Sequence, residues 1–131
     1  MKYLFDSSAI FTAIKQNKIE VLAGNFTLEL ARYELGNIIW KNYALHAKVS
    51  EQESKIMAKT VKHILSLMDI IGIASYEEEI LDTAVKLKIT FYDASYAYLA
   101  KAKDLKLITE DLRLIKKITD AINVSTMDSI K

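Results

Sequence analysis

Apolar and polar positions follow two different patterns along the chain, and the two patterns alternate. Short apolar runs of strand length are separated by segments in which apolar residues return every three or four positions, the spacing of one helix face. The runs predict strands at residues 2–5, 26–27, 70–74, 107–109 and 122–125. The helical spacing predicts helices at residues 7–16, 29–48, 51–69, 75–88, 93–103 and 112–119. This alternation predicts an α/β fold, in which a mostly parallel sheet of about five strands lies between two layers of helices.

Local signals add detail to three of these elements. Ser50 and Glu53 form a capping-box pattern at the start of a helix, and Ser75 and Glu78 repeat it. The uninterrupted apolar run at residues 70–74 is typical of a strand that is covered on both faces. The loop between the two long helices is short, so we expect these helices to pack as an antiparallel pair.

Length and composition narrow the class of protein. The chain has 131 residues, which suits a single domain spanning residues 1–131. It has no cysteine, which excludes disulfides, thiolate zinc sites and cysteine nucleophiles. The first apolar run is interrupted by Asp6, and no apolar window is long enough to span a bilayer, so we expect a cytoplasmic protein with no membrane partner. The net charge of +1 does not by itself indicate nucleic-acid binding.

Three aspartates, Asp6, Asp93 and Asp111, stand where predicted strands end or predicted helices begin. Each of them, taken alone, is explained as a helix N-cap, a contribution of about 1 kcal/mol. In parallel sheets, however, ligands bind beyond the carboxyl ends of the strands. We expect Asp6 and Asp111 to lie at that edge.

Glu34 is harder to explain as a structural residue. It lies inside the apolar stripe of its helix, with Ala31 one turn before it and Ile38 one turn after it. An ionised carboxylate on a buried face needs a partner, or its pKa must rise. A lysine from another element is one possible partner, whereas Arg32 points elsewhere on the helix.

Together, the four acids predict a shared metal site. Four carboxylates at one sheet edge repel one another unless a cation lies among them. Oxygen ligands alone favour Mg²⁺ or Mn²⁺ over zinc. Such an ion can present a water molecule as a nucleophile and neutralise phosphate oxygens, which points to phosphodiester hydrolysis.

The same residues carry a resemblance to a known family. The run Asp93–Lys101 has the form D-A-x-Y-x-x-x-A, and the strand that follows it ends in Thr109-Glu110-Asp111. This block resembles the second half of PIN domains, and more closely the VapC-type toxin ribonucleases. Asp6 with its hydroxyl neighbours resembles the first aspartate of that family, and Glu34 followed by Asn37 resembles its helical glutamate. The resemblance covers the whole chain in order and spacing.

The resemblance implies a compact α/β/α fold and a divalent-metal endoribonuclease with a cognate antitoxin partner. Its catalytic and metal-binding residues would be Asp6, Glu34, Asp93 and Asp111, supported through hydrogen bonds by Ser8 and Thr109. RNA backbone contacts are assigned to the basic residues that follow the last aspartate, although a solvated helix face explains them equally well: Arg113, Lys116 and Lys117. Glu110 either faces solvent or adds to the field at the metal.

Two other functions stay open at this point. A phospho-receiver domain also gathers acids at strand ends, but the region where its phospho-acceptor aspartate would lie, residues 48–59, is predicted to be helical and offers only glutamates. The second is an inert interaction module of the same fold.

We also expect a homodimer, with Trp40 either in the core or on the dimer face, and we expect Tyr96 to be a core or interface residue.

Overall fold

The strands form one parallel sheet. The computed structural model describes residues 2–130, and within them five strands lie in the order β3-β2-β1-β4-β5, with every neighbouring pair parallel. Their bounds are β1 Tyr3–Phe5, β2 Phe26–Leu28, β3 Asp69–Ile71, β4 Lys106–Ile108 and β5 Val124–Ser125. The predicted parallel sheet is therefore confirmed, and it is fully parallel.

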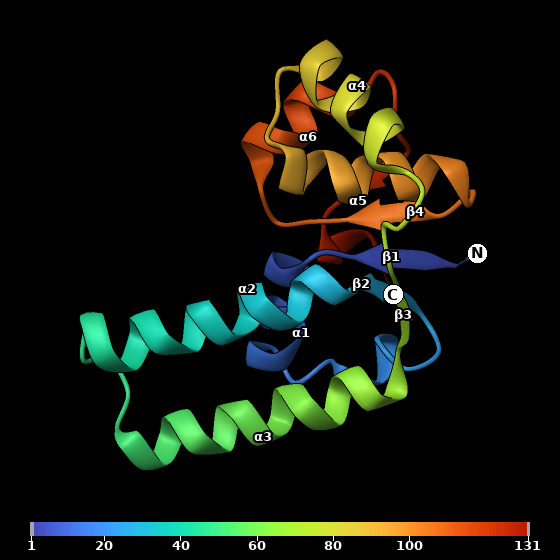
Figure 1. Ribbon diagram of the computed structural model, residues 1–131. Helices are drawn as coiled ribbons and strands as arrows, with labels where there is room; N and C mark the ends of the chain where they lie inside the picture. The colour runs from blue at the N-terminus through green and yellow to red at the C-terminus, as the bar shows by residue number, and fades with distance from the viewer. Residues whose placement is uncertain (1, 131) are drawn as a thin grey trace.

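Helices cover both faces of this sheet, as Figure 1 shows. One face is covered by α1 Ser7–Lys15, α2 Glu29–Trp40 and α3 Glu51–Leu67. The opposite face is covered by α4 Glu77–Leu87, α5 Phe91–Ala102 and α6 Leu112–Ile118. Short turns complete the described part: the 3₁₀ turns Ile19–Val21 and Met127–Ser129, and a π-helical segment, Lys41–Leu45. The expected three-layer α/β/α architecture is confirmed.

Alternation along the strands divides the core between the two faces. Leu4 and Leu107 pack with α5 and α6, whereas their neighbours Phe5 and Ile108 pack with α1, α2 and α3. All four side chains are fully buried. Successive strand residues point to opposite faces, so a strand that is apolar at every position needs a helical layer on each side.

The central strands create the edge at which a site can form. The chain runs from β1 to β2 on one side, and later returns to place β4 on the other side of β1. This reversal of strand order leaves a crevice at the carboxyl ends of β1 and β4, the usual ligand site of an open α/β sheet. Asp6 directly follows β1, and Asp111 lies three residues after the end of β4.

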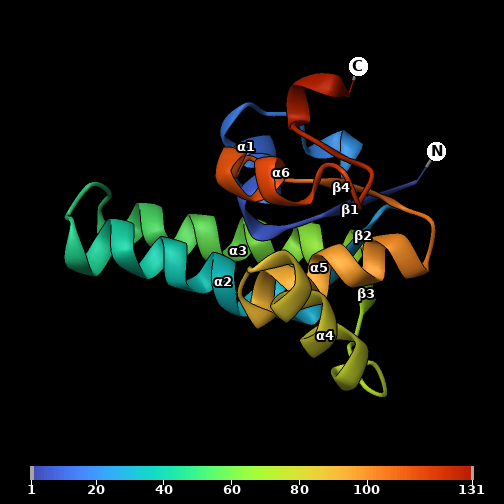
Figure 2. The same ribbon diagram turned by 90° about the horizontal axis from the view of Figure 1, so that it is seen from above.

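Helices α2 and α3 form the predicted antiparallel pair, which extends well beyond the sheet in both views (Figures 1 and 2). The capping box at the start of α3 is confirmed: Ser50 Oγ accepts from the Glu53 amide at 3.1 Å, and the Glu53 carboxylate accepts from the Ser50 amide at 3.0 Å. The expected long helix at residues 29–48 ends sooner. It is α-helical to Trp40 and widens into the π segment, and Ala47 takes a left-handed φ of 50°.

Two expectations for the middle of the chain were wrong. The strand expected at residues 70–74 is shorter, Asp69–Ile71, and it is a partly exposed edge strand rather than one covered on both faces. The second capping box does not form, because Ser75 has a φ of 79° and the N-cap of α4 is Tyr76, which makes no side-chain capping bond.

In residues 2–130, no helix has both the length and the hydropathy needed to cross a membrane.

Candidate active site

Asp6 lies at the carboxyl end of the central strand and is almost fully buried, with 7% of its surface exposed. Its amide donates to the Ile108 carbonyl at 3.1 Å. The pairing of β1 with β4 thus continues for one residue beyond the end of β1. Its Oδ1 accepts from the Ala9 amide at 3.0 Å and from Ser8 Oγ at 2.6 Å. Asp6 is therefore the N-cap of α1, as the simpler reading of the sequence suggested.

The pKa of Asp6 is raised from 3.8 to about 6, mainly by burial and to a smaller extent by the nearby Glu34 carboxylate. Hydrogen bonds from Ser8, Thr109 and Ala9 act in the opposite direction, because they stabilise the ionised form. A helix cap alone does not require such burial. The Asp6 carboxylate is thus held in a place where ionisation costs free energy.

Two hydroxyl groups connect Asp6 to the loop that carries Asp111. Ser8 Oγ accepts from the Glu110 amide at 2.9 Å and lies 3.2 Å from Thr109 Oγ1. Thr109 Oγ1 in turn accepts from the Asp111 amide at 3.2 Å, and Asp111 Oδ1 caps α6 by accepting from the Leu114 amide at 3.1 Å. The expected supporting hydrogen bonds of Ser8 and Thr109 are present, and they join the ends of β1 and β4.

Glu110 belongs to this loop but not to the acidic group. Its Oε1 accepts from the Met127 amide at 2.9 Å, at the start of the last 3₁₀ turn. Its carboxylate is therefore engaged with the backbone of the C-terminal segment, and we assign it a structural role.

Glu34 receives a hydrogen bond from the opposite helical layer. The hydroxyl of Tyr96, on α5, donates to Glu34 Oε1 at 2.8 Å. Burial raises the pKa of Glu34 and the Asp93 carboxylate raises it further, whereas the hydrogen bonds from Tyr96 and Ser7 lower it. Arg32 points away from it, as expected, and binds Glu29 at 2.8 Å.

Asp93 lies in the first turn of α5 and is not its N-cap, so the simpler explanation that the sequence allowed for it does not hold. Thr90 is the N-cap, and its Oγ1 accepts from the Asp93 amide at 3.0 Å. The Asp93 carboxylate is therefore free of the capping role. Burial raises its pKa and so does Asp111, whereas the Thr90 hydrogen bond and the ammonium of Lys117 lower it.

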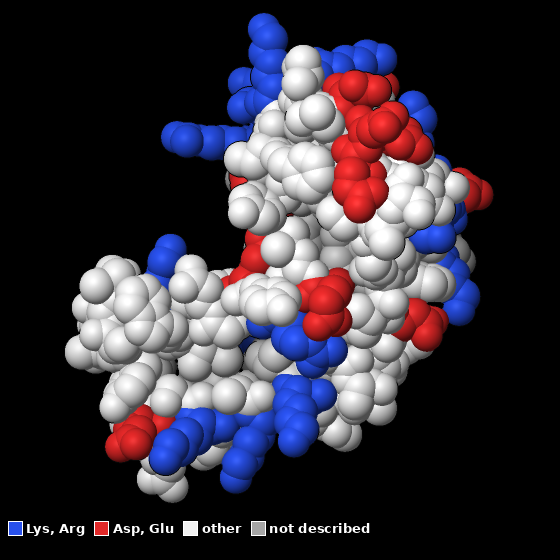
Figure 3. All heavy atoms as spheres, viewed as in Figure 1, with Lys and Arg blue, Asp and Glu red and all other residues white. Residues whose placement is uncertain are grey.

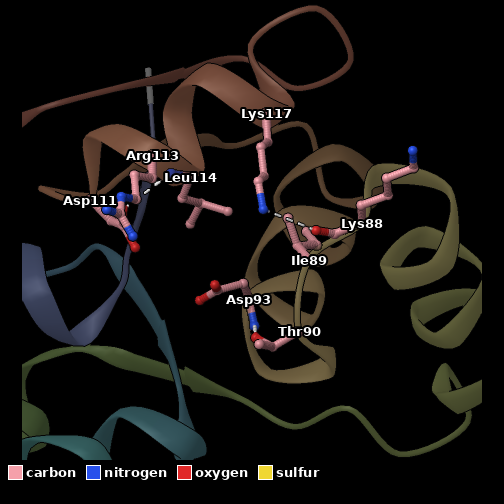
Figure 4. Close-up of a pocket in the computed structure, with 8 residues that line it drawn as sticks. All are labelled: Lys88, Ile89, Thr90, Asp93, Asp111, Arg113, Leu114 and Lys117. Carbon is pink, nitrogen blue, oxygen red and sulfur yellow. Dashed lines mark hydrogen bonds between the residues drawn. The ribbon is translucent and has the colours of Figure 1, made fainter.

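Asp93 and Asp111 line one cavity of about 370 Å³ between α5 and α6, shown in Figure 4. Asp93 and Lys117 point into this space from its two sides. Lys117 Nζ donates to the Lys88 carbonyl at 3.2 Å, which holds the ammonium group at the cavity wall. Arg113 also lines the cavity. Lys116 is exposed on the same helix and does not line it.

Neighbouring members of the four acids repel each other. Glu34 raises the pKa of Asp6, Asp93 raises the pKa of Glu34, and Asp111 raises the pKa of Asp93. The ion pairs in residues 2–130 are Arg32–Glu29 and Lys55–Glu51. In this part of the chain, therefore, no lysine or arginine lies within ion-pair distance of the four acids. The lysine partner considered for Glu34 is therefore absent from the described residues. Figure 3 shows carboxylate atoms recessed in the hollow between α2 and the helices above the sheet, with basic side chains near its upper rim.

This donor set has the chemistry of a site for a hard divalent cation. All four groups are carboxylates, three of them have raised pKa values, and none is paired with a basic residue in the described part. Within residues 2–130, no three acidic or histidine side chains are already close enough to form a complete metal site. A cation would therefore have to draw the side chains toward one another.

Tyr96 is the residue of this site whose contact the sequence reading did not anticipate. It is a core residue, as expected, with 2% of its surface exposed, but its hydroxyl contacts Glu34. One signal was available: Tyr96 follows Asp93 by three positions, so both lie on one face of the same helix. Trp40, by contrast, is 53% exposed and is not part of the core.

Comparison with known proteins gives relatives of similar length. The chain is 34% identical over 129 residues to exonuclease VapC9 of Pyrobaculum aerophilum, covering 97% of this chain and 93% of the relative. It is 32% identical over 91 residues to ribonuclease VapC3 of the same organism, covering 70% of this chain and 69% of the relative. No protein-family model matches the chain.

Solved structures share the fold. The crystal structure of PAE2754 from Pyrobaculum aerophilum has a TM-score of 0.81 and 27% identity, covering 98% of this chain and 91% of the other. A toxin–antitoxin complex from Klebsiella pneumoniae has a TM-score of 0.66 with 19% identity, covering 95% and 97% of the two chains. VapBC2 from Rickettsia felis, bound to a DNA fragment from its promoter, has a TM-score of 0.67 with 19% identity, covering 98% and 100%. At such identities the last two comparisons support the fold alone.

Proposed function

Because the chain belongs to the VapC family of PIN-domain toxin nucleases, we propose that it is a divalent-metal-dependent endoribonuclease and the toxin of a toxin–antitoxin pair. The observation that carries this proposal is the acidic group at the carboxyl edge of the sheet. Four carboxylates from four separate segments repel one another in pairs there, and in the described residues no basic side chain lies within ion-pair distance of them. Such an arrangement costs stability, and a bound cation would offset that cost.

Asp6, Glu34, Asp93 and Asp111 would hold the ion. When bound, Mg²⁺ or Mn²⁺ would polarise the phosphate and lower the pKa of a coordinated water molecule. The chain's own contribution is to place the carboxylates. Ser8 and Thr109 fix Asp6 relative to the Asp111 loop through the hydrogen bonds described above.

The cavity beside Asp93 and Asp111 suits the RNA backbone. Lys117 and Arg113 line it together with the two aspartates, so a phosphate bound there would meet two cations next to the acidic group. The Lys88 carbonyl keeps Lys117 at the cavity wall rather than in bulk solvent. Lys116, outside the cavity, would act at longer range by attracting the polyanion.

The name of one relative states exonuclease action, whereas the name of the other, a ribonuclease, states no mode of cleavage. We propose internal cleavage for this chain. A circular RNA separates the two modes, because it has no end from which an exonuclease can start. Conversion of the circle into a linear product supports endonuclease action, whereas degradation restricted to linear RNA contradicts it.

An antitoxin partner is the second part of the proposal. VapBC2 of Rickettsia felis and the complex of Klebsiella pneumoniae, which share the fold, are toxin–antitoxin assemblies. The α2–α3 pair and the π segment after α2 extend from the body of the molecule. They carry large exposed apolar side chains, which suit an amphipathic helix of an antitoxin: Tyr33, Trp40, Tyr43, Leu45 and Ile56. An arginine from that partner could pair with one of the site carboxylates. The exposed Trp40 is also compatible with the expected homodimer.

The test combines cleavage in vitro with growth of expressing cells. Purified protein should cut labelled RNA with Mn²⁺ or Mg²⁺ and stop when EDTA is added. Asp93→Asn should be inactive yet folded, because Thr90 and not Asp93 caps α5. Expression alone should slow growth, and co-expression of the cognate antitoxin should restore it. No cleavage of several RNAs with either metal would reject the enzyme and favour an inert module of the same fold.

A further inference from the structure

We propose that Tyr96 is a positioning residue of this site, whose hydroxyl holds the Glu34 carboxylate toward Asp93 so that both can contact one cation. This inference rests on the proposed function, since it concerns the geometry of the same acidic group. Tyr96 itself would touch neither the metal nor the RNA. It would act through Glu34.

The hydrogen bond connects the two helical layers of the molecule. Tyr96 and Glu34 are 62 residues apart in sequence, and α2 and α5 lie on opposite faces of the sheet. Asp93 lies one turn before Tyr96 on the same face of α5. A fixed link from Tyr96 to Glu34 therefore sets the position of Glu34 relative to Asp93.

The tyrosine ring gives this link its rigidity. Tyr96 is 2% exposed and belongs to the buried cluster that includes Leu4, Leu28 and Leu99. With the ring locked in the core, the hydroxyl oxygen has one place, and only its hydrogen can rotate. The 2.8 Å bond from this fixed hydroxyl thus holds Oε1 of Glu34 in place.

Packing alone does not explain the hydroxyl group. Phenylalanine would fill the same core position, and burying a hydroxyl group costs free energy unless it finds a hydrogen-bond partner. Glu34 is the partner recorded for this hydroxyl in the described residues. Glu34 is only half-buried and is repelled by Asp93. Ser7, on the α1 side, also hydrogen-bonds this carboxylate, but Tyr96 is the donor that comes from the helix of Asp93.

The hydrogen bond favours the form of Glu34 that can bind a cation. The Tyr96 hydroxyl donates to Glu34 Oε1, and an ionised carboxylate can only accept. Because a metal ligand must be deprotonated, a donor held against this oxygen supports the ligand form of Glu34.

The test is the Mn²⁺ dissociation constant of the full chain, measured by calorimetry or by the paramagnetic resonance of free Mn²⁺. Tyr96→Phe removes one oxygen and keeps the ring, and we expect it to weaken Mn²⁺ binding by about 10- to 100-fold, the usual effect of losing a group that orients a ligand. In cleavage assays at fixed metal, kcat should fall while KM for RNA stays within about twofold. Tyr98→Phe is the matched control, because Tyr98 lies on the same helix and packs against Tyr76 outside the acidic group. It should bind Mn²⁺ like the wild type.

A double-mutant cycle separates positioning from a general effect on the fold. In a Glu34→Gln background, measured at millimolar Mn²⁺, adding Tyr96→Phe should change the dissociation constant by less than about twofold, since the positioned ligand is already gone. An equal loss in both backgrounds, or no loss in the wild-type background, would overturn the positioning role while leaving the proposed nuclease intact. A wild-type chain that does not bind Mn²⁺ would instead overturn the proposed function, and this inference with it.

Discussion

Replacing Asp6 by asparagine should stabilise the metal-free protein at neutral pH. Asparagine has the shape of aspartate and is an equally good N-cap, so its side-chain oxygen can still accept from the Ala9 amide and from Ser8. What the change removes is a carboxylate that must ionise while 93% of its surface is buried, since only 7% remains exposed. It also removes the repulsion between this group and Glu34.

The size of the effect follows from the pKa of Asp6. Raising it from 3.8 to about 6 corresponds to about 3 kcal/mol against the ionised form in the folded state. Between pH 3.8 and about 6 the folded protein keeps the Asp6 proton, whereas the unfolded chain has lost it. The stability that this proton gives the folded wild type is therefore fully present below pH 3.8. It is lost as the pH rises through about 6. Asp6→Asn should therefore gain up to about 3 kcal/mol at pH 7.5 and close to nothing at pH 3.5.

Urea unfolding in EDTA at several pH values, followed by circular dichroism, measures this difference. Asp111→Asn is the control, because Asp111 also caps a helix through its side chain but is exposed. It relieves only the repulsion between Asp111 and Asp93, so we expect a much smaller gain there. Adding Mn²⁺ should reverse the order and make the wild type the more stable protein. If metal-free Asp6→Asn is no more stable than the wild type at pH 7.5, the buried ionised carboxylate is not the source of strain that we infer.

Three further predictions concern the metal, Glu34 and a helix cap. Mn²⁺ at a hundred times its dissociation constant should raise the free energy of unfolding by about 2.7 kcal/mol, and a melting temperature unaffected by millimolar metal would reject the shared site. Glu34→Gln should abolish RNA cleavage at little cost in stability, since Tyr96 can still donate to the amide oxygen; a loss of about 3–5 kcal/mol with activity retained would mean that Glu34 belongs to a buried ion pair. Ser50→Ala should cost about 1 kcal/mol in urea unfolding because it breaks the capping box with Glu53, whereas Ser75→Ala should cost nothing, because Ser75 caps no helix.

Local features of the chain were predictable because their causes lie within a few residues. The capping box of α3 depends on Ser50 and Glu53 alone, and it forms as the sequence indicates. The second pattern, Ser75 with Glu78, fails because the chain turns through a left-handed residue at Ser75, where a capping serine needs an extended conformation. The same limit applies to Asp93: Thr90 precedes it by three residues and takes the N-cap position, a choice between two competent residues that the pattern leaves open.

By itself, the sequence determined the alternation of strands and helices, the parallel sheet between two helical layers, and the placement of Asp6 and Asp111 at strand ends, because hydrophobic period and chain order suffice for these. Only the tertiary structure decided which side chains meet. The bond between Tyr96 and Glu34 crosses from one layer to the other, and the connection of Ser8 to Thr109 spans 101 residues. Such contacts depend on how far apart the packed layers lie and on which rotamers the core permits, and no pattern along the chain encodes either quantity.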